Sequence, residues 1–146
     1  MTQEQKELLL KDLCARLPYG VVIQEKCVEQ DESFLPNKEG DRLVNIDSHA
    51  DLLMTNCGSW YYLDEVKPYL FSLSSMTEEQ KRELSNICKC LIHFTDWEIY
   101  FPNYEDNNMG NWQKIVSWMY KNHYDINGLI EKGLAIDASG LNIKIY

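Results

Sequence analysis

Residues 64–80 constrain the fold most strongly, because they divide the chain into two halves of different character. The first part of this stretch surrounds Pro68 with an extended run that is rich in aromatic and apolar residues. The last part places Thr77 three residues before Gln80. This is a capping box, in which hydroxyl and amide side chains satisfy the first free N–H groups of a helix. The sequence therefore predicts strands before this stretch and helices after it.

The length of 146 residues, of which 45% are hydrophobic and 25% charged, fits one globular domain or two small units with a common core. We expect residues 1–73 to form a helix and about five short strands. We expect residues 74–146 to form a helical half with a strand-like tail, and the two halves to share one core.

The first half begins with another capping box, formed by Thr2 and Gln5, and Pro18 and Gly20 end the helix that it starts. Apolar residues recur at helical spacing within it: Leu9, Leu10, Leu13, Cys14 and Leu17. Runs of β-branched, aromatic and alternating apolar residues then predict strands at 21–28, 42–48, 52–54, 60–63 and 69–73.

One helix followed by short strands with tight turns is typical of a small, strongly bent antiparallel barrel of the SH3-like or Sm-like type. Residues 64–68 suit the single 3₁₀ turn before the last strand of such a barrel. The alternative is an open, bent sheet with helices packed on one face. In either case the predicted fold class is α+β, with an N-terminal helix and a small antiparallel barrel or bent sheet followed by a helical C-terminal half.

The second half predicts helices over 77–92 and 112–122, separated by an irregular segment at 93–111. Leu129 and Ile130 belong to a short amphipathic turn that Gly133 closes. Residues 141–146 alternate apolar and polar side chains, which predicts a strand that returns to a sheet edge.

The net charge of −9, without any cluster of Lys or Arg, argues against a surface that follows nucleic-acid phosphates. No stretch approaches the roughly 18 apolar residues that a membrane-spanning helix needs, and the polar start of the chain does not resemble a signal peptide. The five cysteines have no regular disulfide spacing. We therefore expect a cytoplasmic protein whose thiols are small, buried apolar groups.

Asp47, His49 and Asp51 alternate along the chain, so an extended segment would place two carboxylates and an imidazole on one face, as a metal site requires. The alternative, which we favour, is a polar turn between two strands. Residues 106–110 resemble the start of a calcium loop, but Asn111 and Ser117 occupy its glycine and glutamate positions.

Catalytic patterns are absent from the sequence. It has no glycine-rich phosphate loop, no GxSxG elbow and no HExxH helix. Cys88 and Cys90 would point to opposite sides of a helix and cannot chelate as a pair. His123, close to a helix end, suits a capping role or a contact with the helix dipole. We predict a protein that is not an enzyme and has neither a cofactor nor a catalytic or structural metal.

Three blocks of the sequence, at 8–20, 66–80 and 122–143, resemble a family of small uncharacterised proteins encoded by phages, prophages and mobile elements of gut anaerobic bacteria. The chain departs from that family at Asn127, where an Arg is common. The resemblance implies a genomic setting and brings no catalytic residues with it.

The aromatic segment 97–104 is the predicted site of interaction with another protein, because Trp and Tyr rings outside a helical period often anchor a partner. Its candidate residues are Trp97, Tyr100, Phe101 and Tyr104. The alternative is that these rings fill a gap between the two halves. The predicted function is that of a non-catalytic accessory protein that binds a host or phage protein. The alternative function is to bind, and thereby sequester, a small polar ligand or nucleotide.

Overall fold

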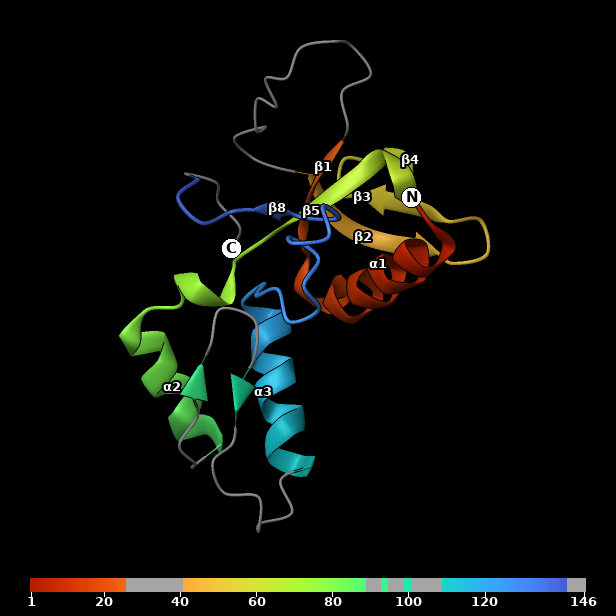
Figure 1. The fold of residues 1–146 in the computed structure, drawn as a ribbon. Helices are drawn as coiled ribbons and strands as arrows, with labels where there is room; N and C mark the ends of the chain where they lie inside the picture. The colour runs from red at the N-terminus through yellow and green to blue at the C-terminus, as the bar shows by residue number, and fades with distance from the viewer. Residues whose placement is uncertain (26–40, 89–92, 95–98, 101–108, 142–146) are drawn as a thin grey trace.

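The computed structural model of the protein describes residues 1–25, 41–88, 93–94, 99–100 and 109–141 (Figure 1). An N-terminal helix lies against an open, mostly antiparallel sheet, and two C-terminal helices lie side by side next to this unit (Figure 1). The predicted α+β class is confirmed.

The sheet contains six strands in the order β4-β3-β2-β1-β5-β8. Their bounds are β1 (Val22–Glu25), β2 (Asp41–Asp47), β3 (Leu52–Thr55), β4 (Trp60–Tyr62), β5 (Val66–Leu70) and β8 (Ile136–Asp137). The turn η2 (Leu63–Glu65) joins β4 to β5, and β5 returns to pair with β1. This is the connectivity expected of an SH3-like barrel, including its 3₁₀ turn. The sheet is nevertheless open, because β4 and β8 lie at opposite ends of the order and are not paired with each other.

Helix α1 (Gln3–Arg16) starts at the predicted capping box, in which the Thr2 hydroxyl accepts from the Gln5 N–H and the Gln5 side chain accepts from the Thr2 N–H. Leu9 and Leu13 are fully buried against the inner face of the sheet. Cys14, predicted to be buried, is exposed. Burying two leucines four residues apart turns the neighbouring position 14 towards solvent.

The second apolar cluster lies between α2 (Glu78–Cys88) and α3 (Met109–Lys121), next to the short turn η3 (Leu73–Ser75). Thr77 caps α2 as predicted, since its hydroxyl accepts from the Gln80 N–H at 3.2 Å. The Trp118 ring stacks on Tyr124 with centroids 5.6 Å apart. Strands β6 (His93–Phe94) and β7 (Ile99–Tyr100) form a separate two-stranded pair that the sequence did not predict.

The chain passes between the sheet cluster and the helical cluster twice, once after β5 and once after α3, and the two passages are hydrogen-bonded to each other. The Phe71 N–H donates to the His123 carbonyl, and the Asp125 N–H donates to the Phe71 carbonyl, both at 2.9 Å. Beyond this link the chain returns to the sheet, where Leu129, Leu134 and Ala135 pack in the same cluster as Leu9 and Leu13. The predicted turn at Gly133 is confirmed, with φ at +71°.

The strand predicted at 141–146 falls almost wholly outside the described residues. In the described part of the chain, β8 supplies the strand at this edge and runs parallel to β5. None of the described helices is long and apolar enough to cross a bilayer.

Candidate functional site

The outward side of the β3–β4 hairpin carries four large side chains. Strand pairing places Met54 beside Trp60 and Leu52 beside Tyr62, and the alternation of buried and exposed residues turns all four away from the core. We call these four residues the outer hairpin face. On the neighbouring β2, the register continues the two rows with Asn45 and Asp47.

The two rings of this face are its most exposed members. Trp60 is 49% exposed and Tyr62 is 56% exposed, whereas Leu53, between Leu52 and Met54 on the other side of β3, is fully buried. Leu52 and Met54 are half-buried beside the rings. An isolated exposed apolar residue needs no explanation, but neighbouring rings and aliphatic chains on one strand pair indicate a contact surface.

One backbone N–H on the free edge of β4 already has a hydrogen-bond partner. The Thr55 N–H donates to the Ser59 carbonyl, and the Leu63 N–H donates to the Asp51 carbonyl. These two residue pairs are therefore hydrogen-bonded pairs of the hairpin. By the antiparallel alternation, the Tyr62 N–H then points away from β3. It donates to Glu65 Oε2 at 2.8 Å. A strand that paired with this edge would have to displace the Glu65 carboxylate.

Cys57 lies in the turn at the tip of the hairpin and is exposed, which corrects the expectation that the cysteines are buried. Turns place their side chains at the surface, and no helix covers this one in the described part of the chain. Its hydrogen bonds with the Ser59 and then the Thr55 side chain lower the pKa of the thiol. These partners are hydroxyl groups, which cannot act as the general base of a nucleophilic site.

The sequence Asp47-Ser-His49-Ala-Asp51 forms the turn between β2 and β3. Asp47 Oδ1 accepts from the backbone N–H of His49 at 3.0 Å and of Ala50 at 3.2 Å, and Asp51 adopts φ of +52°. The favoured alternative of a polar turn is therefore confirmed. Among the described residues, no group of three or more His, Cys, Asp or Glu side chains is arranged to hold a metal ion.

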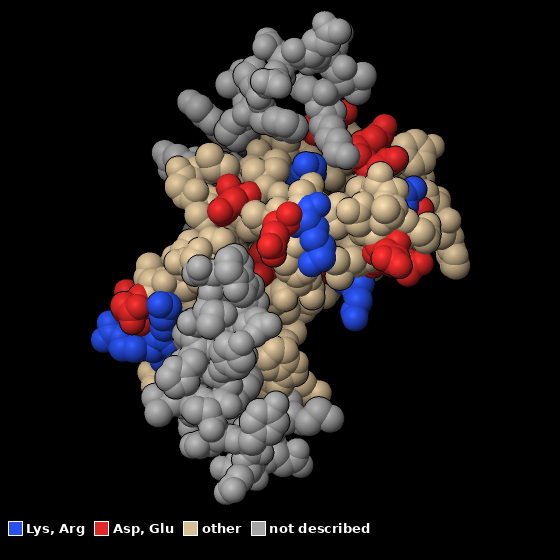
Figure 2. Space-filling view, viewed as in Figure 1, with Lys and Arg blue, Asp and Glu red and all other residues tan. Residues whose placement is uncertain are grey.

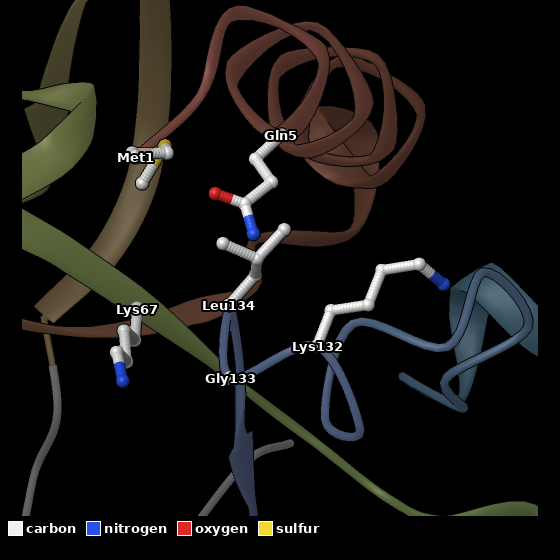
Figure 3. A pocket seen from close by; sticks show the side chains of 6 residues that line it. All are labelled: Met1, Gln5, Lys67, Lys132, Gly133 and Leu134. Carbon is white, nitrogen blue, oxygen red and sulfur yellow. The ribbon is translucent and has the colours of Figure 1, made fainter.

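A shallow cavity of about 210 Å³ lies between the start of α1 and residues 132–134 (Figure 3). Two lysines, Lys67 and Lys132, contribute to its lining, but their ammonium groups point away from the Gln5 amide in the close view (Figure 3). Lys132 Nζ instead donates to the carbonyl of Asn127 at 3.1 Å. The cavity therefore lacks a set of polar groups that converge on one point.

A buried polar junction lies where α1 meets the end of α3. Arg16 forms a bidentate ion pair with Asp12, with Nε–Oδ2 at 2.6 Å, and both side chains are 0% exposed. Arg16 also donates to the Tyr124 carbonyl at 2.7 Å and lies over the Tyr120 ring. Asn127 donates to Asp12 at 2.7 Å. The junction ties α1 to the C-terminal segment, and among the described residues Arg16 Nη1 is its one guanidinium nitrogen without a hydrogen-bond partner.

His123 borders this junction and ends α3. Its N–H donates to the Tyr120 carbonyl, the next N–H donates to the Met119 carbonyl, and its φ is +61°. This is a Schellman cap, usually occupied by glycine, so the predicted capping role is confirmed for the backbone. Burial, then the charges of Arg16 and Arg42, lower the pKa of the imidazole to about 4.

The aromatic segment predicted from the sequence is not tested by the structure. Trp97, Phe101 and Tyr104 lie outside the described residues, and only the backbone of Tyr100 is described, in β7. The residues missed at the sequence level are Trp60 and Tyr62. Their spacing of two was a signal that they share a face, but the sequence did not indicate which face is covered.

Comparison with known proteins gives no family assignment. A scan against models of protein families finds no match. A search of curated proteins and a search of solved structures also find no significant match. The interpretation of function therefore rests on the residues themselves.

Proposed function

We propose that this protein acts without catalysis, by binding another protein through the outer hairpin face. One observation carries the proposal: Trp60 and Tyr62 are about half exposed on the same side of an edge strand and are flanked by Leu52 and Met54. Aromatic side chains of this kind dominate the energetics of protein interfaces, because each ring buries a large area at little entropic cost.

The setting of the partner is proposed from the sequence. The resemblance to proteins of phages and mobile elements supports a partner encoded by the host or by a phage. The cavity between α1 and residues 132–134 supports the alternative, a small polar ligand, less well. Its volume of about 210 Å³ is below the usual range of roughly 300–1,000 Å³ for ligand pockets.

The proposal is tested by capture of partners from a lysate with tagged wild-type protein and with the variants Trp60→Ala and Tyr62→Ala. Both variants should melt close to the wild-type temperature, because exposed side chains contribute little to stability. Each should lose a captured protein, since truncation of an interface anchor costs about 2 kcal/mol or more of binding free energy.

Trp112→Ala is the matched control, because Trp112 is 46% exposed on α3 and does not belong to the sheet. This variant should capture the same protein as wild type. The proposal is wrong if Trp60→Ala and Tyr62→Ala retain the partner, or if Trp112→Ala alone loses it. The latter result would move the contact surface to the helical half of the chain.

A further inference from the structure

We infer that the segment recognised by the outer hairpin face carries Lys or Arg side chains next to apolar ones. This inference rests on the proposed function and specifies the chemistry of the partner. It follows from the uneven distribution of charge along the hairpin, whose two ends differ.

The end of the hairpin at Tyr62 is acidic. Asp47 stands in the same cross-strand row as Leu52 and Tyr62, and it is exposed. Asp51 lies at the same end, because its carbonyl accepts from the Leu63 N–H at 2.9 Å. The chain then continues from Tyr62 into η2, which adds the exposed carboxylates of Asp64 and Glu65.

The end at Trp60 has one carboxylate and one cation beside it, because Asp41 and Arg42 begin β2 next to the turn, where the Arg42 N–H donates to the Asn56 side chain and the Asn56 N–H donates to the Arg42 carbonyl. The row of Trp60 and Met54 continues to Asn45, and the adjoining turn contains Cys57, Gly58 and Ser59. Within residues 41–65 the only Lys or Arg is Arg42, and it donates to the Gly20 carbonyl at 3.1 Å. The face thus joins an aromatic end with one carboxylate and one cation beside it to an end with four carboxylates.

This arrangement matches a segment that places an apolar side chain against Trp60 and Met54 and a cation near Tyr62. A Lys or Arg there would be attracted by the carboxylates and could lie over the Tyr62 ring in a cation–π contact. The same carboxylates would repel nucleic-acid phosphates and anionic lipids. A second copy of the chain has no cluster of Lys or Arg in its sequence that would complement these carboxylates, so it fits this face less well than a basic segment.

The described basic side chains on the face drawn in Figure 2 do not form a comparable surface. On the face drawn in Figure 2, acidic and basic side chains of the described residues are interspersed and do not form one extended basic area. Lys81, for example, pairs with Glu78 on α2 at 3.0 Å. The hairpin is therefore complementary in charge to a cationic partner.

Two synthetic peptides test the inference. They share the same apolar residues at alternate positions, with Lys at the remaining positions in one peptide and Glu in the other. In ¹H–¹⁵N spectra, the Lys peptide should shift the indole N–H resonance of Trp60, and its Kd should rise several-fold between low and high salt as the charges are screened. The Glu peptide should leave this resonance in place.

A variant with the four carboxylates neutralised isolates the role of charge. It combines Asp47→Asn, Asp51→Asn, Asp64→Asn and Glu65→Gln, which keep the side-chain oxygens that close the β2–β3 turn and accept from the Tyr62 N–H. Asn is also tolerated at the positive φ of Asp51. This variant should bind the Lys peptide about tenfold more weakly or worse.

The control variant removes four negative charges from other exposed positions. It combines Glu4→Gln, Glu7→Gln, Glu79→Gln and Glu131→Gln. It has the same net charge as the hairpin variant, so equal weakening in both would show a general effect of net charge and overturn the inference.

The outcomes separate this inference from the proposed function. Equal shifts of the Trp60 resonance by both peptides, or unchanged affinity in the hairpin variant, would overturn the preference for cations while leaving the face as a contact surface. No shift with either peptide would also overturn the inference, and the capture experiment with Trp60→Ala would still decide the proposed function independently.

Discussion

His123 should make the protein lose stability in mild acid. Its imidazole is only 3% exposed, and its Nδ1 has no hydrogen-bond partner among the described residues. Burial and the positive charges of Arg16 and Arg42 lower its pKa from 6.5 to about 4. A proton taken up in the folded state would place a buried positive charge where the charges of Arg16 and Arg42 oppose it.

The sign and size of the effect follow from linkage. In the unfolded chain the imidazole binds a proton as the pH falls below 6.5, whereas in the folded protein it stays neutral until about pH 4. The unfolded state therefore gains stability through this window. The loss in free energy of unfolding should reach about 1 kcal/mol at pH 5.5 and about 2–3 kcal/mol at pH 4.5, and should level off below pH 4.

The assay is urea unfolding at pH 7.5 and pH 4.5 for wild type and for His123→Asn. Asn accepts the positive φ of this position, so the cap is retained while the titrating group is removed. The variant should lose about 2–3 kcal/mol less than wild type between the two pH values. Carboxylates that titrate in this range are common to both proteins and cancel in the difference.

His49→Asn is the control, because His49 is exposed in the β2–β3 turn. It should show the same pH dependence as wild type. The reasoning is refuted if His123→Asn and wild type lose equal free energy of unfolding between pH 7.5 and pH 4.5, since the depressed pKa could then not be a property of the folded state.

Two further predictions concern α1. In urea unfolding, Leu13→Ala should lower the free energy of unfolding by about 2–5 kcal/mol, because a fully buried side chain is removed and a cavity remains. Cys14→Ala, on the exposed side of the helix, should change this free energy by less than about 0.5 kcal/mol. Equal effects of the two substitutions would contradict the buried stripe. Asp12→Asn should cost about 3–5 kcal/mol, because Arg16 keeps its charge in a buried site, whereas Glu78→Gln, which breaks an exposed pair, should cost less than about 1 kcal/mol. Similar melting temperatures for these last two variants would show that the Arg16 charge is compensated elsewhere.

Local signals predicted most of the fold. Thr2 and Thr77 each begin a helix because their partners three residues later complete a capping box, which depends on nothing outside the helix. The strands β1 to β4 were predicted because alternation and turn residues are also local. The fifth strand was predicted at 69–73, after a 3₁₀ turn at 64–68, but the turn ends at Glu65 and β5 spans Val66–Leu70, so its predicted start was wrong by three residues. The pairing of β8 with β5 could not be predicted, since a strand of two residues carries no period and its place depends on the path of the chain.

The buried polar junction could not be predicted for a related reason. Asp12 and Arg16 are four residues apart, which in a sequence is typical of an exposed ion pair on a helix. Their burial results from contacts with residues more than 100 positions later, including the Tyr124 carbonyl and Asn127. A long-range contact of this kind leaves no periodic signal within α1. The predicted buried stripe therefore included Cys14 and left out Asp12 and Arg16.

The outer hairpin face shows why a contact surface on a strand is hard to predict. All three residues of β4 are aromatic, so both faces of the strand are apolar in the sequence, and alternation indicates only that Trp60 and Tyr62 share one of them. Other segments of the chain determine which face of the sheet is covered. Helix α1 covers the inner face, and residues 136–138 cover the outer face over β1 and β5, where Val22 and Tyr69 are buried with Ala138. In the described part of the chain, residues 136–138 do not extend over β3 and β4. The exposure of Trp60 and Tyr62 is therefore set by the path of the C-terminal segment.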